Sequence, residues 1–296
     1  MEPVLVPSMD GFFLSCMLYG VENPKGLVQI IHGAAEHKGR YHEVASILQA
    51  AGFCTLVSDL RGHGESIDSR FVRGYMPPIR VLVEDQYKIS CFLMDLHPGV
   101  PLHMLGHSLG SNIARLYLGS HDGQLSSLVM TGCPFHVPGI MFGKAFVRIL
   151  MLFLSEHGYG FISSKLTTSA SLKWVCSDPS VIEERRSDPY RKNYRYQLAS
   201  IHTIFDSVQK LHAWKLYACT NPTLPILCIT GSDDPVPGGA AGLADTKRSL
   251  HRIGYTQVES KVFDGMRHEV LMEVDKQDVF DLVLSFLEHP GHSRTT

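Results

Sequence analysis

The chain alternates between short, continuously apolar runs and longer segments whose apolar residues recur with helical spacing. Apolar runs that predict strands lie at residues 3–8, 12–19, 26–33, 53–60, 101–107, 125–132, 223–231 and 254–265. Helical spacing predicts helices over residues 41–52, 79–96, 111–118 and 277–289. The turn "MDG" between the first two runs predicts an antiparallel pair. Apolar strands separated by helices are otherwise typical of an α/β fold, with a mostly parallel sheet flanked by helices on both faces.

This alternation stops between residues 134 and 222, a stretch that has helical spacing and no clear strand. We therefore predict a core domain formed by residues 1–133 and 223–296, with a helical lid, or cap, inserted over 134–222. Inside the lid, residues 140–154 are apolar apart from Lys144 and Arg148. We favour a helix packed onto the core, because wide apolar stripes usually face cores. The alternative is a helix that lines a ligand channel or makes transient contact with a membrane surface.

Composition excludes several classes of partner. The chain has 296 residues, of which 44% are hydrophobic and 19% charged, and its net charge of −2 gives no basic excess for nucleic acid. Seven cysteines without a CxxC pair favour free thiols in a reducing compartment. The start, "MEPVLVPSMDG", lacks the basic segment and apolar run of a signal peptide. We expect a cytoplasmic protein with no metal site, no cofactor and no nucleic-acid partner.

The candidate chemistry centres on "GHSLG", residues 106–110, between an apolar run and a helical segment. At a strand-to-helix turn this GxSxG pattern is the nucleophile elbow, in which a strained backbone exposes the serine hydroxyl. Side chains two positions before and after Ser108 would collide, so Gly106 and Gly110 are needed there. The alternative, that Ser108 is a simple helix cap, does not require either glycine.

A nucleophilic serine needs a base, and the base needs an orienting carboxylate. In this kind of fold the order along the chain is Ser, then Asp or Glu, then His. The late run "LPILCITGSDDPV" offers two acids, Asp233 and Asp234, and "VESKVFDGMRHEV" offers the base, His268. The tetrahedral intermediate also needs amide donors. We expect these from Leu109, the residue after the nucleophile, and from Ala34, which follows the third apolar run.

Five motifs together carry a resemblance to a known family. They are "HGAAEHKGRY", "DLRGHGES", "GHSLG", "GSDDPV" and "GMRHE". In order and spacing, the chain from about residue 12 to 287 resembles the monoglyceride lipase and lysophospholipase branch of the α/β-hydrolases. The resemblance implies the α/β-hydrolase fold, with Ser108 as nucleophile, Asp234 as acid, His268 as base, and the amides of Ala34 and Leu109 as the oxyanion hole.

The resemblance also implies a lid over an apolar acyl channel, with Glu36, Arg40 and His107 lining its polar end near glycerol. Mammalian monoglyceride lipases carry a second histidine three residues after the catalytic one, where this chain has Leu271. We therefore predict a serine hydrolase that cleaves carboxylic esters of single-chain lipids. The alternatives are a lysophospholipase, a general carboxylesterase, a serine aminopeptidase, for which "HGAAE" replaces the usual "HGGPG", and a non-catalytic binding protein of the same fold.

Overall fold

A computed structural model describes residues 1–135, 137–159, 172–191 and 194–291. Its centre is one eight-stranded sheet, in the order β1-β2-β4-β3-β5-β6-β7-β8. The strands are β1 (Glu2–Pro7), β2 (Phe13–Tyr19), β3 (Gly26–Ile31), β4 (Phe53–Ser58), β5 (Leu102–His107), β6 (Leu125–Thr131), β7 (Ile226–Gly231) and β8 (Val258–Phe263). Strands β1 and β2 pair antiparallel, as does β2 with β4, and all other pairs are parallel. The predicted α/β-hydrolase sheet and its antiparallel start are confirmed.

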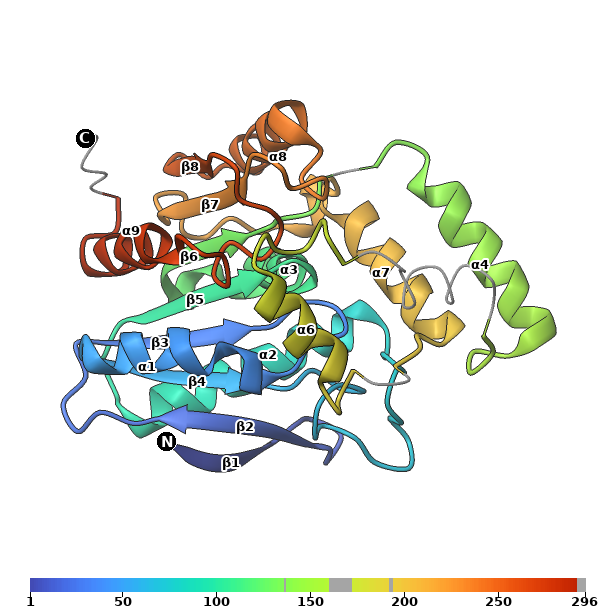
Figure 1. Ribbon diagram of the computed structural model, residues 1–296, viewed down its shortest axis with the longest axis horizontal. Helices are drawn as coiled ribbons and strands as arrows, with labels where there is room; N and C mark the ends of the chain where they lie inside the picture. Colours follow the sequence, from blue (N-terminus) through green and yellow to red (C-terminus); the bar gives the residue numbers. More distant parts are fainter. Residues whose placement is uncertain (136, 160–171, 192–193, 292–296) are drawn as a thin grey trace.

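Helices cover both faces of this sheet (Figure 1). They are α1 (His42–Ala50), α2 (Ile79–Leu96), α3 (Leu109–His121), α8 (Gly239–Ile253) and α9 (Lys276–Glu288). Helices α1 and α9 lie in front of the sheet in Figure 1, and α2 and α3 lie behind it. Helix α8 was not among the predicted helices, because its sequence is mostly small and polar residues with few apolar positions.

Alternating residues of the central strand β3 supply the two cores. Leu27 and Ile31 pack in the larger core on one face, whereas Val28 and Ile30 pack in the core on the α1 and α9 face. This alternation is the period of two that a strand imposes. All six residues of β3 are buried, which is why its sequence is continuously apolar except for Gln29. The Gln29 amide group donates to Gln86 Oε1 at 2.9 Å, so its burial leaves the polar group bonded.

The segment between β6 and β7 contains helices α4 (Ile140–Leu154), α6 (Pro179–Ser187) and α7 (Leu198–Lys210), and its described residues form no strand. The predicted lid also includes residues 136, 160–171 and 192–193, which lie outside the described residues, as do 292–296 of the predicted core. In Figure 1, α6 crosses in front of the sheet, while α4 and α7 lie together to the right of it, past the ends of the strands. No helix in the described ranges is long and apolar enough to cross a membrane.

The favoured interpretation of residues 140–154, a helix packed onto the core, is only partly right. One side of α4 packs on α7, and Val147 is its one buried residue. The other side exposes a row of large apolar residues, among them Phe142, Leu152 and Phe153. The apolar positions surround this helix, so a single partner helix cannot cover them all.

Candidate active site

Ser108 lies in the tight turn that joins β5 to α3. Its backbone has φ 52° and ψ −115°, a left-handed conformation that is uncommon for a residue with a side chain. A Cβ on Gly106 would lie 2.6 Å from the carbonyl oxygen of Gly110, and one on Gly110 would lie 2.1 Å from that of Ile31. Both glycines are therefore required by close backbone approach. The turn has the geometry of a nucleophile elbow.

His268 and Asp234 meet beside this turn, from the loops that follow β8 and β7. His268 Nδ1 lies 2.9 Å from Asp234 Oδ2, and both residues are buried. The second oxygen of Asp234 accepts the amide of Val236 at 2.9 Å, which fixes the carboxylate. Asp233 is exposed, and among the described residues its carboxylate accepts only from the Ser232 hydroxyl. Of the two candidate acids, the structure brings Asp234 to the histidine.

Ser108 and His268 line the same cavity, of about 420 Å³. The described residues include no hydrogen-bond partner for the Ser108 hydroxyl. Because Asp234 holds Nδ1, the other ring nitrogen of His268 is the one left for the serine. In substrate-free enzymes this contact is often long, and it shortens when the substrate binds.

Ala34 and Leu109 line the same cavity. Leu109 is the first residue of α3, so its amide has no partner within the helix. The amides on either side of Ala34 are already bonded: that of Gly33 donates to Glu36 Oε2 at 2.9 Å, and that of Ala35 to the Tyr196 hydroxyl at 2.6 Å. The backbone amide of Ala34 has no hydrogen-bond acceptor among the described residues. This pattern leaves Ala34 and Leu109 free to bind an oxyanion.

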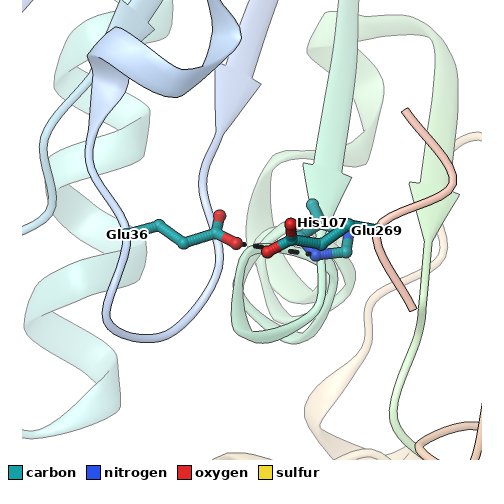
Figure 2. A group of neighbouring side chains, drawn as sticks. All are labelled: Glu36, His107 and Glu269. Carbon is teal, nitrogen blue, oxygen red and sulfur yellow. Dashed lines mark ion pairs between the residues drawn. The ribbon is translucent and has the colours of Figure 1, made fainter. Parts of the chain in front are cut away.

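The carboxylates of Glu36 and Glu269 lie close to the ring of His107, beside the cavity (Figure 2). Glu269 binds Arg40 through both oxygens at 2.8 Å. Glu36 Oε1 lies 3.0 Å from the Arg185 guanidinium, which also donates to Glu269. Such buried carboxylates repel unless cations neutralise them, and these two arginines do so. Ligand atoms of Glu36, His107 and Glu269 lie within 4.8 Å of one another, but Arg40 and Arg185 bring the positive charge that a metal ion would supply.

Protonation in this cluster follows from its charges. Burial opposes ionisation of Glu36, but the permanent positive charges of Arg40 and Arg185 hold the pKa of Glu36 well below its usual value. Burial lowers the pKa of His107 to about 3, despite the opposing charge of Glu36, so His107 is neutral at physiological pH. Its Nδ1 lies 2.9 Å from the Thr131 hydroxyl. The cluster therefore holds two carboxylates and two guanidinium groups, with a neutral imidazole between it and His268.

The cavity has two chemically different walls. The apolar wall comes mainly from the segment after β6 and from α7; its residues are Pro134, Phe135, Val137, Ile140, Ile204, Phe205, Val208 and Val236. The polar wall is formed by Glu36, Arg185, Arg191 and Tyr196. A pocket of this kind suits a ligand with an apolar tail and a polar head.

The structure agrees with some of the predicted positions and differs at others. Glu36 lies on the cavity wall, as predicted. Arg40 and His107 do not; they lie behind Glu36, because Glu269 and Thr131 hold their polar groups. Sequence reasoning missed Arg185 and Arg191, although the run "EERRSDPYR" in the lid contains both. Only the contact with distant acids distinguishes Arg185 from a solvated surface charge.

Trp174 is a further residue that the sequence did not reveal. Its ring lies 5.2 Å from the ring of His268, centroid to centroid, and it lines the cavity. His32 and His63, in contrast, make contacts that hold neighbouring segments in place. His32 Nε2 accepts the Leu60 amide at 3.0 Å, and His63 Nε2 lies 3.2 Å from the Tyr196 hydroxyl.

A strained serine at the carboxyl end of a parallel strand, beside a histidine–aspartate pair, is the arrangement of an α/β-hydrolase. Comparison with known proteins agrees. A family model described as "Serine aminopeptidase, S33" matches residues 22–275. Monoglyceride lipase from Homo sapiens is 34% identical over 273 residues, which cover 90% of this chain and 82% of the relative. Monoacylglycerol lipase from Mycolicibacterium smegmatis is 27% identical and covers 90% and 89%.

Solved structures show the same fold. A soluble variant of monoglyceride lipase from Saccharomyces cerevisiae, in complex with a substrate analog, superposes with a TM-score of 0.75 at 22% identity, over 97% of this chain and 96% of the other. The chain therefore belongs to the α/β-hydrolase family that the serine aminopeptidase model describes and that includes the monoglyceride lipases. It is a hydrolase of this family.

Proposed function

We propose that this protein is a serine hydrolase that cleaves carboxylic esters of single-chain lipids, such as monoacylglycerols. One observation supports this most: the strained Ser108 and the His268–Asp234 pair open into a cavity with one apolar and one polar wall. The names of the relatives agree with a lipase or esterase reaction.

In the proposed mechanism, the hydroxyl of Ser108 attacks the ester carbonyl and its proton passes to His268. Asp234 orients the ring and stabilises the imidazolium that forms. The amides of Ala34 and Leu109 bind the oxyanion of the tetrahedral intermediate. His268 then protonates the leaving alcohol, and an acyl-enzyme remains on Ser108. Water activated by His268 attacks the acyl-enzyme, releases the fatty acid and regenerates the serine.

The substrate class follows from the two walls of the cavity. We propose that one acyl chain lies along the apolar wall, where each buried methylene contributes up to ~0.8 kcal/mol. The alcohol part would then lie against the polar wall, within reach of Glu36. Arg40 and His107, expected from the resemblance to contact glycerol, would act by holding Glu36 and Glu269 in place. A triacylglycerol carries three chains, whereas the cavity offers one apolar wall, so we expect little activity on it.

We further propose that residues 134–222 form the cap over this cavity, and that the exposed apolar face of α4 contacts lipid surfaces. Such a face beside Lys144 and Arg148 has the character of an interfacial helix. The seven cysteines are free, which is compatible with the cytoplasmic location expected from the sequence.

The test is a substrate panel with the purified protein. It contains p-nitrophenyl esters of graded chain length, a monoacylglycerol, lysophosphatidylcholine, a triacylglycerol and aminoacyl amides, with Ser108→Ala as the control for contaminating activity. We expect kcat/KM to rise with acyl length and little activity on triacylglycerol. A preference for acetyl esters would contradict the acyl channel, and a preference for aminoacyl amides would identify a peptidase.

A further inference from the structure

Arg191 differs from the other cations near the site because no described residue bonds to its guanidinium. It lies four residues after α6, half-buried, and lines the polar wall of the cavity. Within the described residues, its guanidinium makes no hydrogen bond or ion pair, and its Nε is buried without a partner. Removing a guanidinium from water without a hydrogen-bond partner costs free energy. A bound ligand can supply the missing acceptor.

The carboxylates around Arg191 are already bonded elsewhere. Glu36 accepts from Tyr41 and Arg185, and Glu269 binds Arg40 and Arg185. These two acids and two arginines cancel in charge. Asp188, the remaining acid, lies 3.1 Å from His37 Nε2 and also accepts the amide of Tyr190 at 2.8 Å.

The charged side chains that line the polar wall are Glu36, Arg185 and Arg191, so the lining carries more positive than negative charge. Burial and Arg40 lower the pKa of Arg191, and the charges of Asp188 and Glu36 oppose this effect. Arg185 lines the same wall, and its Nε is also buried without a partner. A phosphate bound at this wall would supply an acceptor for Arg191, and it matches the planar fork of a guanidinium.

We infer that the polar wall of the cavity is an anion site, in which Arg191 binds a phosphate carried on the alcohol part of a single-chain ester. This inference rests on the proposed function, and it narrows the substrate from neutral monoacylglycerols to lysophospholipids with an anionic head. The phosphate stays on the leaving alcohol throughout, so it takes no part in the acyl transfer.

The test compares two soluble esters that differ only in this group, 1-decanoylglycerol and 1-decanoylglycerol 3-phosphate. We expect the wild-type protein to show a higher kcat/KM for the phosphate ester, by about ten-fold or more, as a charge-assisted hydrogen bond allows. Arg191→Gln should reduce the ratio of the two kcat/KM values to near one, and Arg191→Lys should reduce it less, because a lysine keeps the charge without the fork.

Arg186→Gln is the matched control. Arg186 is exposed on α6, pairs with Glu183 and does not belong to the described residues that line the cavity, so its loss should leave the ratio unchanged. If Arg191→Gln is too unstable to assay, inhibition of the wild type tests the same inference. The inhibition constant of glycerol 3-phosphate against a neutral ester should be at least about ten-fold lower than that of glycerol.

Equal kcat/KM values for the two esters, or an equal fall of the ratio in Arg186→Gln, would overturn the inference. Hydrolysis of the neutral ester alone would leave the proposed function intact. Failure to hydrolyse either ester, with Ser108 unreactive, would contradict the proposed function itself.

Discussion

Two parts of the segment between β6 and β7, helix α4 and residues 172–187, are held in different ways. Helix α4 packs on α7 along one side and leaves Phe142, Leu152 and Phe153 between 73% and 80% exposed. The part over residues 172–187 is tied to the loop that carries His268. There the Glu269 amide donates to the Val175 carbonyl at 2.8 Å, and the Ser177 amide donates to the Glu273 carboxylate.

This difference indicates separate roles for helix α4 and for residues 172–187. Arg185 bonds both Glu36, in the loop after β3 that also contains Ala34, and Glu269, next to His268. We therefore expect the part over 172–187 to position these two loops for any ester. The residue of α4 that lines the cavity is its first, Ile140, so we expect the exposed face of this helix to affect only how substrate arrives.

The largest effect should follow loss of the Arg185 side chain. Arg185→Met leaves two buried carboxylates with one guanidinium, so we expect the free energy of unfolding to fall by about 3–5 kcal/mol. Displacement of the catalytic loops should lower kcat for a short ester by about a hundred-fold. Thermal unfolding and kcat for p-nitrophenyl acetate measure these two effects.

The matched control is a substitution on helix α4. Arg148 is exposed on α4 and has no bonded partner in the described residues. Arg148→Met should change stability by less than about 0.5 kcal/mol and leave kcat for the short ester unchanged. Similar effects of the two substitutions would contradict the division of the cap.

The pH dependence of activity tests the role of charge, because only the ring of His107 separates the Glu36–Arg40–Arg185–Glu269 cluster from His268. The His107 and His268 rings are 4.8 Å apart, and the charges that face His268 are those of Asp234 and of the Glu36–Arg40–Arg185–Glu269 cluster. His107, with its pKa near 3, stays neutral throughout. We expect the kcat/KM of the wild type to rise with pH along an acid limb, whose midpoint reports the charge around the proposed base.

Substitutions in the cluster should move that midpoint in opposite directions. Arg185→Met leaves the cluster with one net negative charge, which favours imidazolium and shifts the midpoint to higher pH, on the order of one unit. Glu269→Gln leaves one net positive charge and shifts it to lower pH. The double variant should return towards the wild-type value. Shifts of the same sign in both single variants would show that packing, rather than charge, controls the profile.

The smallest effect should come from the exposed face of α4. Replacing Leu152 and Phe153 together by serine removes apolar area that no described residue covers, so stability and hydrolysis of a soluble ester should be unchanged. Hydrolysis of a monoacylglycerol embedded in vesicles should fall several-fold, because the helix loses its interfacial side chains. A fall with the soluble ester as well would mean that this face packs against the protein.

The sheet was predictable because its strands are buried on both faces and are therefore continuously apolar, as β3 and β7 show. Helix α8 was not, because few apolar residues mark its buried side. The three candidate triad residues were predictable since each follows a recognisable strand. Arg185 was not, because a charge run normally indicates a solvated helix face. Its partners Glu36 and Glu269 lie 149 and 84 residues away, a contact that only the fold creates.

The most direct test of the central claim is the reaction of the protein with a fluorophosphonate, followed by mass spectrometry and rate measurement. We predict a single adduct on Ser108, labelled about ten-thousand-fold more slowly in Asp234→Asn, because the histidine loses its tautomer and its charge partner. Asp233→Asn, the neighbouring control, should react at the wild-type rate. Labelling at another residue, or equal rates in the two asparagine variants, would contradict the Ser108–His268–Asp234 assignment.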